Sequence, residues 1–265
     1  SRSAFKPYNN RSDSVEASEC AILKSACDIE IETDDANPMK IQTPNSRPYH
    51  ILKELLMTER TTLFDLKLLV QDFYRLFPQH VLTSGRALSE LFNALKPLYD
   101  FHRSLLNDLD TKLTNWESSM GNCKGNTNSD QLRVGDLLLC AVHNALHQYR
   151  SFVQQMPIFL AAIDELSRTN QAFANALRSM EEEPFCYLAI NHLMLKVANR
   201  MVAWQNILGR MVAALLEEGT DTAGASQLSN SRVALEKVAS FNSETELTRD
   251  GLANFVKLVE LEKEL

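Results

Sequence analysis

Apolar side chains recur every three or four positions along most of this chain, which is the spacing of one face of an α-helix. The pattern begins at about residue 51 and runs to Phe77, where Pro78 ends it, because proline cannot continue a helix interior. Charged residues such as Glu54 and Arg60 fill the positions between. We therefore predict one long first helix. Its apolar positions are Ile51, Leu52, Leu55, Leu56, Leu63, Leu66, Leu69, Val70 and Phe73.

The same period returns later in the chain, and no useful stretch alternates apolar and polar residues as a strand would. Residues 118–130 and 219–230 are rich in Gly, Ser, Asn or Thr and are predicted as loops. We expect Pro97 to lie at a bend or in the first turn of a following helix, and we expect a turn at Pro184 and a weak point at Gly251. The further predicted helices are residues 84–96, 98–117, 131–154, 157–181, 186–218 and 231–265. The predicted fold class is all-α, an elongated bundle of about six long helices.

Residues 1–46 differ from the rest of the chain. They are rich in Ser, Asn and Asp, show no sustained periodicity, and end in a stretch punctuated by Pro38, Pro44 and Pro48. Such a segment cannot bury enough apolar surface to fold alone. We predict a disordered linker or leader over residues 1–46, preceded by another domain in the full protein, and a single helical domain over residues 47–265.

Composition and charge narrow the class of protein. Apolar residues make up 45 % of the chain, enough for a sizeable core, and the net charge of −7 argues against nucleic acid as a partner. The five cysteines are odd in number and form no CxxC pair, which favours free thiols in a reducing compartment. No signal peptide is visible, and no stretch reaches the roughly 18 apolar residues of a spanning helix. We therefore predict a cytoplasmic protein without a transmembrane segment.

One histidine pair has the spacing of a metal site. His143 and His147 lie four residues apart, as in HExxH zinc sites, but the general-base glutamate of that motif is missing. A structural role is the preferred interpretation, and a metal-dependent enzyme stays an alternative. No phosphate-binding glycine loop and no nucleophile elbow is present, so neither a cofactor nor a covalent catalytic centre is predicted. The other histidines are scattered and indicate no site: His50, His80, His102 and His192.

Two further patterns are interpreted as structural. The acidic run at residues 181–183, directly before Pro184, is taken as a solvated surface. A stripe of large side chains at helical spacing is taken as core packing. Its members are Met194, Met201, Trp204 and Met211.

Three segments, in order, resemble the conserved regions of Dbl-homology (RhoGEF) domains. Residues 51–66, ILKELLMTERTTLFDL, resemble the first region, ELLxTERxYLxDL. Residues 91–116, with LYDFH at 98–102, look like the second. Residues 186–200, CYLAINHLMLKVANR, resemble the signature helix FLLKPxQRxxxY. The phrases YDFHR, RVGDLLL and CYL are most similar to the FERM, RhoGEF and pleckstrin domain protein (FARP) group, and the resemblance covers residues 48–265.

The resemblance implies a guanine-nucleotide exchange factor that binds a Rho-family small GTPase of Rac or Rho type and promotes GDP release. Exchange of this kind breaks no covalent bond, so the domain would act by binding rather than as an enzyme. The family implies a role in Rho GTPase signalling to the cytoskeleton. It also implies FERM and pleckstrin-homology domains outside this chain, which would bring the protein to the periphery of the plasma membrane.

The resemblance also implies which residues bind the GTPase. Glu59 matches the family's switch I acceptor, and Lys196 matches the lysine that reaches switch II. Asn199 and Arg200 stand at the Gln and Arg of the signature, and Glu246 is the candidate on the last long helix.

The third region departs from the family pattern. Val197 replaces the usual proline, which would let the helix run straighter, and the smaller Ala198 follows it. Thr62 and Trp204 stand where tyrosines are usual. These departures favour a second hypothesis, a catalytically impaired domain that acts as a scaffold or protein-interaction module. Autoinhibition by the last helix or by a neighbouring domain is a further hypothesis.

Overall fold

The computed structural model describes residues 46–75, 86–121, 133–218 and 222–264. The compact unit that contains them runs from Gln42 to Leu265. The predicted linker at residues 1–46 lies almost entirely outside the described residues, as do the predicted end of the first helix at Phe77 and most of the predicted loop at 118–130.

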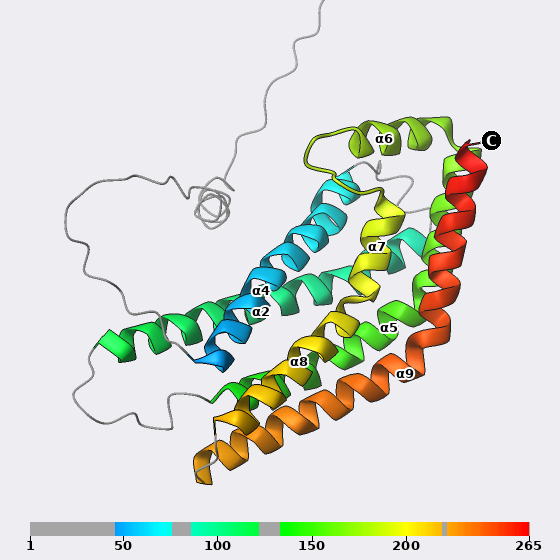
Figure 1. Cartoon of the computed structure of the whole chain (residues 1–265). Helices are drawn as coiled ribbons and strands as arrows, with labels where there is room; N and C mark the ends of the chain where they lie inside the picture. The colour runs from blue at the N-terminus through cyan, green and yellow to red at the C-terminus, as the bar shows by residue number, and fades with distance from the viewer. Residues whose placement is uncertain (1–45, 76–85, 122–132, 219–221, 265) are drawn as a thin grey trace, which may run out of the picture. The chain divides into compact units, whose positions relative to one another are not determined.

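The described residues form helices, with no strand among them, and the all-α prediction is confirmed (Figure 1). The first helix, α2, continues directly into a short π-helix, η1, so the periodic pattern from residue 51 forms one continuous rod to Phe73. The elements in chain order are α2 (Arg47–Lys67), η1 (Leu68–Phe73), α4 (Arg86–Gly121), α5 (Val134–Thr169), α6 (Gln171–Glu181), α7 (Ile190–Ala198), α8 (Arg200–Glu217) and α9 (Thr222–Glu264).

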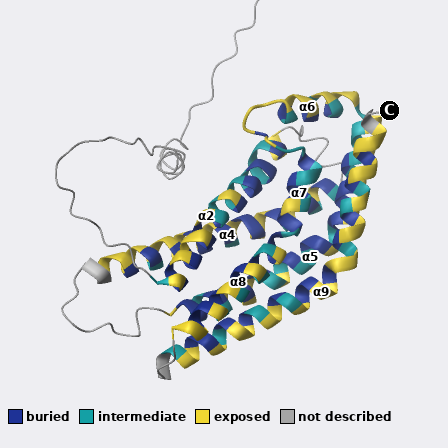
Figure 2. Cartoon of the chain, in the orientation of Figure 1, coloured by how far each residue is buried: buried dark blue, intermediate teal, exposed yellow. Residues whose placement is uncertain are grey.

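The helices bury their apolar faces against one another (Figure 2). Helix α5 packs between α4 and α9, α8 lies along α9, and α2 packs on α4 and α8. Burial of the apolar stripe, rather than local propensity, holds such long helices together. The largest fully buried side chains are Trp204, Tyr49, Tyr149, Phe73, Phe152, Phe159 and Phe241.

Two expected interruptions are absent from the structure. Helix α4 runs through Pro97 and α5 runs through Pro157, so the segments predicted as separate helices are single elements. An interior proline removes one backbone hydrogen bond, and continuous packing on both sides outweighs that loss here. The chain instead turns at Asn170, whose side chain accepts a hydrogen bond from the Phe173 N–H at 3.1 Å and so caps α6.

The predicted loop at residues 219–230 is wrong for its described part, because α9 already begins at Thr222. The reason is a tertiary contact that the local composition does not reveal. The Gln227 side-chain oxygen accepts hydrogen bonds from the N–H groups of Gly135 (2.8 Å) and Asp136 (3.3 Å), which caps the start of α5. The Asn230 amide donates to Asp136 at 2.5 Å. A Cβ atom at residue 135 would lie 2.2 Å from the Gln227 carbonyl oxygen, so this approach requires glycine.

Candidate functional site

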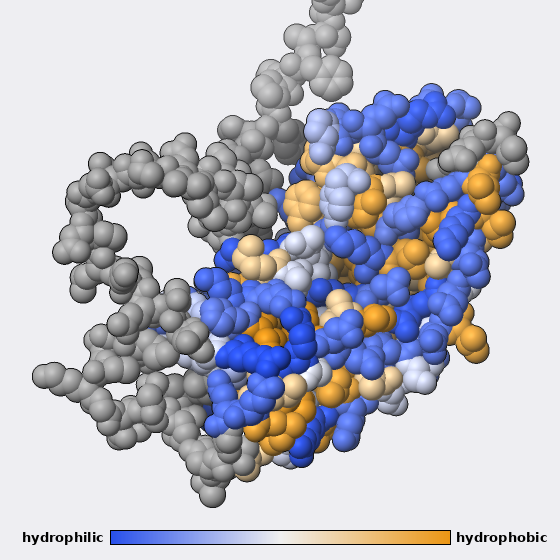
Figure 3. Space-filling model, in the orientation of Figure 1, coloured by the Kyte–Doolittle hydropathy of each residue, from blue (hydrophilic) through white to orange (hydrophobic). Residues whose placement is uncertain are grey.

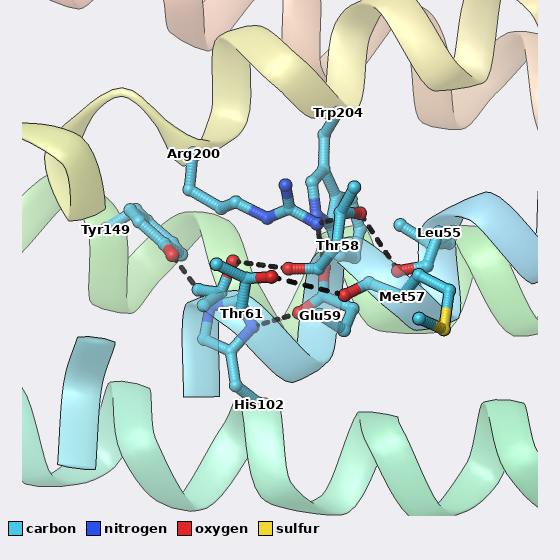
Figure 4. A network of polar contacts seen from close by, with 10 residues as sticks. Leu55, Met57, Thr58, Glu59, Thr61, His102, Tyr149, Arg200 and Trp204 are labelled. Carbon is cyan, nitrogen blue, oxygen red and sulfur yellow. Dashed lines mark hydrogen bonds and ion pairs between the residues drawn. The ribbon is translucent and has the colours of Figure 1, made fainter. Parts of the chain in front are cut away.

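A network of buried polar side chains surrounds Glu59, which is 0 % exposed (Figure 4). One carboxylate oxygen accepts from Arg200 Nη2 and from Trp204 Nε1, each at 2.7 Å. The other oxygen lies 2.5 Å from His102 Nδ1. His102 Nε2 lies 2.7 Å from the Tyr149 hydroxyl. Side chains of α4 and α8 therefore bond the one carboxylate of α2, and α5 joins the network through His102.

The donor and acceptor roles in the network are mutually consistent. A carboxylate only accepts, so His102 Nδ1 carries the hydrogen that points at Glu59. His102 Nε2 faces the Tyr149 hydroxyl, and the buried carboxylate of Glu59 forms an ion pair with Arg200. Arg200 Nη2 also donates to the Thr58 hydroxyl at 2.8 Å. These hydrogen bonds fix α8 against α2.

The electrostatics of Glu59 follow from these neighbours. Burial alone would raise the pKa of its carboxyl group, because a low-dielectric interior disfavours the charge. The neighbouring His102 and Arg200 more than offset burial and lower the pKa from 4.5 to about 2. Burial raises the pKa of Tyr149 well above its usual value, and the charge of Glu59 adds to that effect. Glu59 is thus ionised and Tyr149 protonated at neutral pH.

Sequence reasoning missed His102, Trp204 and Tyr149 as members of this network. In the sequence, His102 looks like one of several scattered histidines and Trp204 like a core-packing residue. Trp204 is indeed 1 % exposed, but its indole N–H is also a donor to Glu59. The available signal was that His102 lies inside the LYDFH segment and Trp204 four residues after Arg200, on the same helix face.

Lys196 lies in a second cluster, at the boundary between core and solvent. Its ammonium group is 2.8 Å from Asp65 Oδ2 and donates to the Tyr187 hydroxyl at 2.5 Å. The Tyr187 hydroxyl in turn donates to the other oxygen of Asp65. Partial burial would lower the pKa of Lys196, but the bonds to Asp65 and Tyr187 raise it overall. The Lys196 side chain is 41 % exposed and charged, so a partner protein can reach it.

The signature helix breaks two residues after Val197. Helix α7 ends at Ala198, Asn199 has φ −86° and ψ 2°, and α8 begins at Arg200. The Asn199 amide donates back to the Leu195 carbonyl at 3.0 Å, which satisfies a carbonyl at the helix end. The expected straighter helix is therefore wrong. The break turns Arg200 inward to Glu59 while Lys196 stays at the surface.

The structure does not bring all predicted site residues together. Glu59 and Arg200 form one buried pair, Lys196 belongs to the second cluster, and Asn199 lies between them. Glu246 is exposed on α9, where its charge acts on Arg249, three residues away on the same helix. No described contact links Glu246 to Glu59 or Lys196.

An acidic residue that sequence reasoning also missed lies on the exposed side of α2. Glu54 forms a two-fold ion pair with Arg210 of α8, with atoms 2.8 and 2.5 Å apart. Both side chains are about half exposed, at 46 % and 47 %. Glu54 precedes Glu59 by five positions, which on a helix turns it to a different face. The helical spacing of the apolar positions around Leu55 and Leu56 could have indicated that Glu54 and Glu59 lie on different faces of α2.

The pair His143 and His147 lines an open groove between α5 and α9, of about 520 Å³, together with Arg150 and Lys237. In the part of the chain that the structure describes, no three His, Cys, Asp or Glu side chains are grouped so that they could hold a metal ion. None of the described helices is both long and apolar enough to cross a membrane.

The surface over α2, α7 and α8 mixes polar and apolar side chains, and α6 at its upper edge is mostly polar (Figure 3). Exposed large apolar residues on α2 and on the connection to α7 are Met57, Phe185 and Tyr187.

Comparison with known proteins gives a consistent result. A family model described as RhoGEF domain matches residues 51–243. FERM, ARHGEF and pleckstrin domain-containing protein 2 of Mus musculus is 28 % identical over 223 residues, which cover 84 % of this chain and 20 % of that protein. FYVE, RhoGEF and PH domain-containing protein 6 of Homo sapiens is 26 % identical over 73 % of this chain and 13 % of that protein. The chain thus spans about a fifth or less of these relatives.

Solved structures share the fold. The crystal structure of the DH domain of FARP2 superposes with a TM-score of 0.69 at 24 % identity, covering 84 % of this chain and 99 % of that one. The DH/PH fragment of PDZRhoGEF, solved in complex with human RhoA, gives a TM-score of 0.56 at 19 % identity, over 76 % of this chain and 55 % of that one.

Proposed function

The chain belongs to the RhoGEF domain family, and on that premise we propose that it is the exchange-factor domain for a Rho-family small GTPase. Membership over residues 51–243 carries the proposal. The solved complex of a related fold with RhoA supports a GTPase as the class of partner. A Rac- or Rho-type GTPase is the proposed partner, and FERM and pleckstrin-homology domains like those of the relatives are the proposed neighbours in the whole protein.

The proposed mechanism is differential binding. A GTPase holds its nucleotide through phosphate and Mg²⁺ contacts arranged by its switch loops. A protein that binds the nucleotide-free form more tightly weakens nucleotide binding by the same factor. Each tenfold weakening requires about 1.4 kcal/mol of differential binding. A broad helical face with a few well-placed charges can supply several such factors.

We propose different roles for the two parts of the site. Lys196 is the accessible cation of α7 and makes the partner contact. Glu59 and Arg200 act as positioning residues, because both carboxylate oxygens of Glu59 are occupied inside the bundle. Glu54, whose side chain is 46 % exposed, is the acidic group that α2 offers to a partner. Asn199 sets the angle between α7 and α8, and Glu246 stays a candidate contact on α9.

The second candidate function is a non-catalytic docking or scaffold module of the same family. Val197 in place of the usual proline and the full burial of Glu59 favour it. In that case the face would bind a GTPase or another protein without distinguishing its nucleotide states. The two functions differ in one measurable quantity, the rate of GDP release.

The test is release of a fluorescent GDP from a panel of Rho-family GTPases. Acceleration of one GTPase, reduced at least tenfold by Lys196→Ala and by Glu54→Ala, is the expected result. Lys257→Ala provides the matched control, since this exposed lysine on α9 lies in none of the clusters described. Binding to a GTPase without acceleration of release would instead establish the scaffold function.

A further inference from the structure

Tyr187 stands out among the described tyrosines by its position. The residue is 48 % exposed, whereas Tyr49, Tyr99 and Tyr149 are buried. It lies in the non-helical connection between α6 and α7, which Figure 2 shows as largely exposed. Tyr74 is also exposed but lies on a helical stretch after η1, with its ring against Phe92. Protein kinases bind their substrates as extended segments, so Tyr187 has the more suitable backbone.

The sequence before Tyr187 is acidic. Glu182 and Glu183 precede it by five and four residues and are both exposed. Glu181 has a separate structural task, because its carboxylate accepts the Ile190 N–H at 3.0 Å at the start of α7. Charge patterns around a substrate residue are one way in which kinases select targets. The exposed pair of glutamates suits a tyrosine kinase with a basic substrate groove.

The Tyr187 hydroxyl has an unusual place for so exposed a residue. It donates to the nearly fully buried carboxylate of Asp65 and accepts from the Lys196 ammonium group. The ring also stacks on Phe64, with centroids 6.4 Å apart. The one hydroxyl that a kinase could reach on this connection is therefore the one that holds Lys196 beside α2.

We propose that Tyr187 is a phosphorylation site that switches the Lys196 cluster. A tyrosine kinase would transfer the γ-phosphoryl group of ATP: a bond forms between the Tyr187 oxygen and phosphorus, the bond to ADP breaks, and the hydroxyl proton is released. The consequence for exchange rests on the function proposed above, whereas the modification itself does not.

Phosphorylation would reverse the charge relations of the cluster. The phosphate adds about −1.5 to −2 charges and removes the hydrogen that bonds Asp65. Asp65 is fixed in the core, so repulsion drives the phosphorylated ring outward. Lys196 has a flexible, half-exposed side chain and follows the phosphate, which forms stronger charge-assisted hydrogen bonds. The positive charge of Lys196 is then paired with the phosphate, and its ammonium group points away from α2.

In the first experiment, the full chain is incubated with Mg-ATP and a tyrosine kinase that prefers acidic residues before the target tyrosine. The phosphorylated residue is then identified by mass spectrometry. A free peptide of residues 180–190 shows that the kinase is active. We expect one phosphate on Tyr187, lost in Tyr187→Phe and kept in Tyr74→Phe; peptide mapping also separates Tyr8, which lies outside the described residues. Phosphate on the peptide but not on Tyr187 of the folded chain would overturn the proposal.

The second experiment follows Lys196 after modification. The ¹⁵N signal of its ammonium group, assigned through Lys196→Arg, is expected to shift on phosphorylation of the wild-type chain and to stay fixed in kinase-treated Tyr187→Phe. GDP release should fall at least tenfold in the same sample. An unchanged Lys196 signal, or unchanged release from an active chain, would refute the switch. If the untreated chain has no exchange activity, the proposed function fails, while the mapping and the lysine signal still decide this proposal.

Discussion

At the scale of single residues, the chain separates its charges by depth. Glu59 is fully buried and receives hydrogen bonds from His102, Arg200 and Trp204, whereas Glu54 and Lys196 keep about half of their side chains in solvent. A buried charge is tolerated when it is paired and hydrogen-bonded, whereas an exposed charge can exchange partners with solvent or with another protein. The buried group therefore contributes to stability, and the exposed groups are those available for binding.

The substitution Glu59→Gln tests the buried pair. It leaves Arg200 without a counter-charge in the core, which typically costs about 3–5 kcal/mol. Because the folded pKa of Glu59 is about 2 against 4.5 for a free carboxyl group, its contribution is complete above about pH 4.5 and is lost as pH falls towards 2. Urea unfolding of both proteins from pH 7 to pH 3 should give a difference that is constant at first and then shrinks.

The matched control is Glu54→Gln. Its pair with Arg210 is half exposed, so the expected loss at pH 7 is about 0–1 kcal/mol. A difference for Glu59→Gln that stays the same at pH 3 and pH 7 would mean that Glu59 is not ionised in the folded protein. If that variant does not fold, Trp204→Phe serves in its place: it removes one donor to Glu59 together with part of the buried ring volume.

At the scale of elements, the sequence predicted well which segments are helical but predicted poorly where the helices end. Apolar periodicity identified most of the α-helical segments because side-chain spacing is a local property. The ends depend on contacts between distant residues. The segment around Gln227 looks like a loop in the sequence but is helical and bonds the start of α5, and α5 continues through Pro157 because it packs on both sides. The same limit applied to the candidate site, where the motif proposed Glu59 and Lys196 but could not indicate how deeply either one is buried.

Gly135→Ala tests the contact that joins the starts of α5 and α9. The added Cβ would lie 2.2 Å from the Gln227 carbonyl oxygen, and backbone cannot yield there as a side chain could. We expect a loss of about 1–3 kcal/mol in the free energy of unfolding. Gly209→Ala is the control: nothing lies within 4 Å of the methyl group that alanine would add, and alanine favours a helix by about 0.5–1 kcal/mol. A stabilising Gly135→Ala would contradict the close approach.

At the scale of the whole molecule, the helices combine a rigid interior with an outer face over α2 and α7. The Glu59 network fixes α2 to α8, and the break at Asn199 lets the neighbouring Lys196 remain at the surface. Because this face is already held firmly in place, ordering it costs little free energy when a partner binds. A rigid interior with an accessible outer face suits a domain that is proposed to change the conformation of a GTPase while keeping its own.

The domain boundary predicted from composition can be tested by truncation. A chain that begins at residue 46 keeps every described helix, and we expect its urea midpoint and its GDP-release activity to equal those of residues 1–265. A chain that begins at residue 59 removes the buried side chains of Tyr49, Leu52 and Leu55, each worth about 1.5–3 kcal/mol, and should not fold cooperatively. Circular dichroism and urea unfolding distinguish these outcomes. A lower midpoint for the chain that begins at residue 46 would mean that the preceding segment stabilises the helices, because loss of an unstructured leader removes no buried surface.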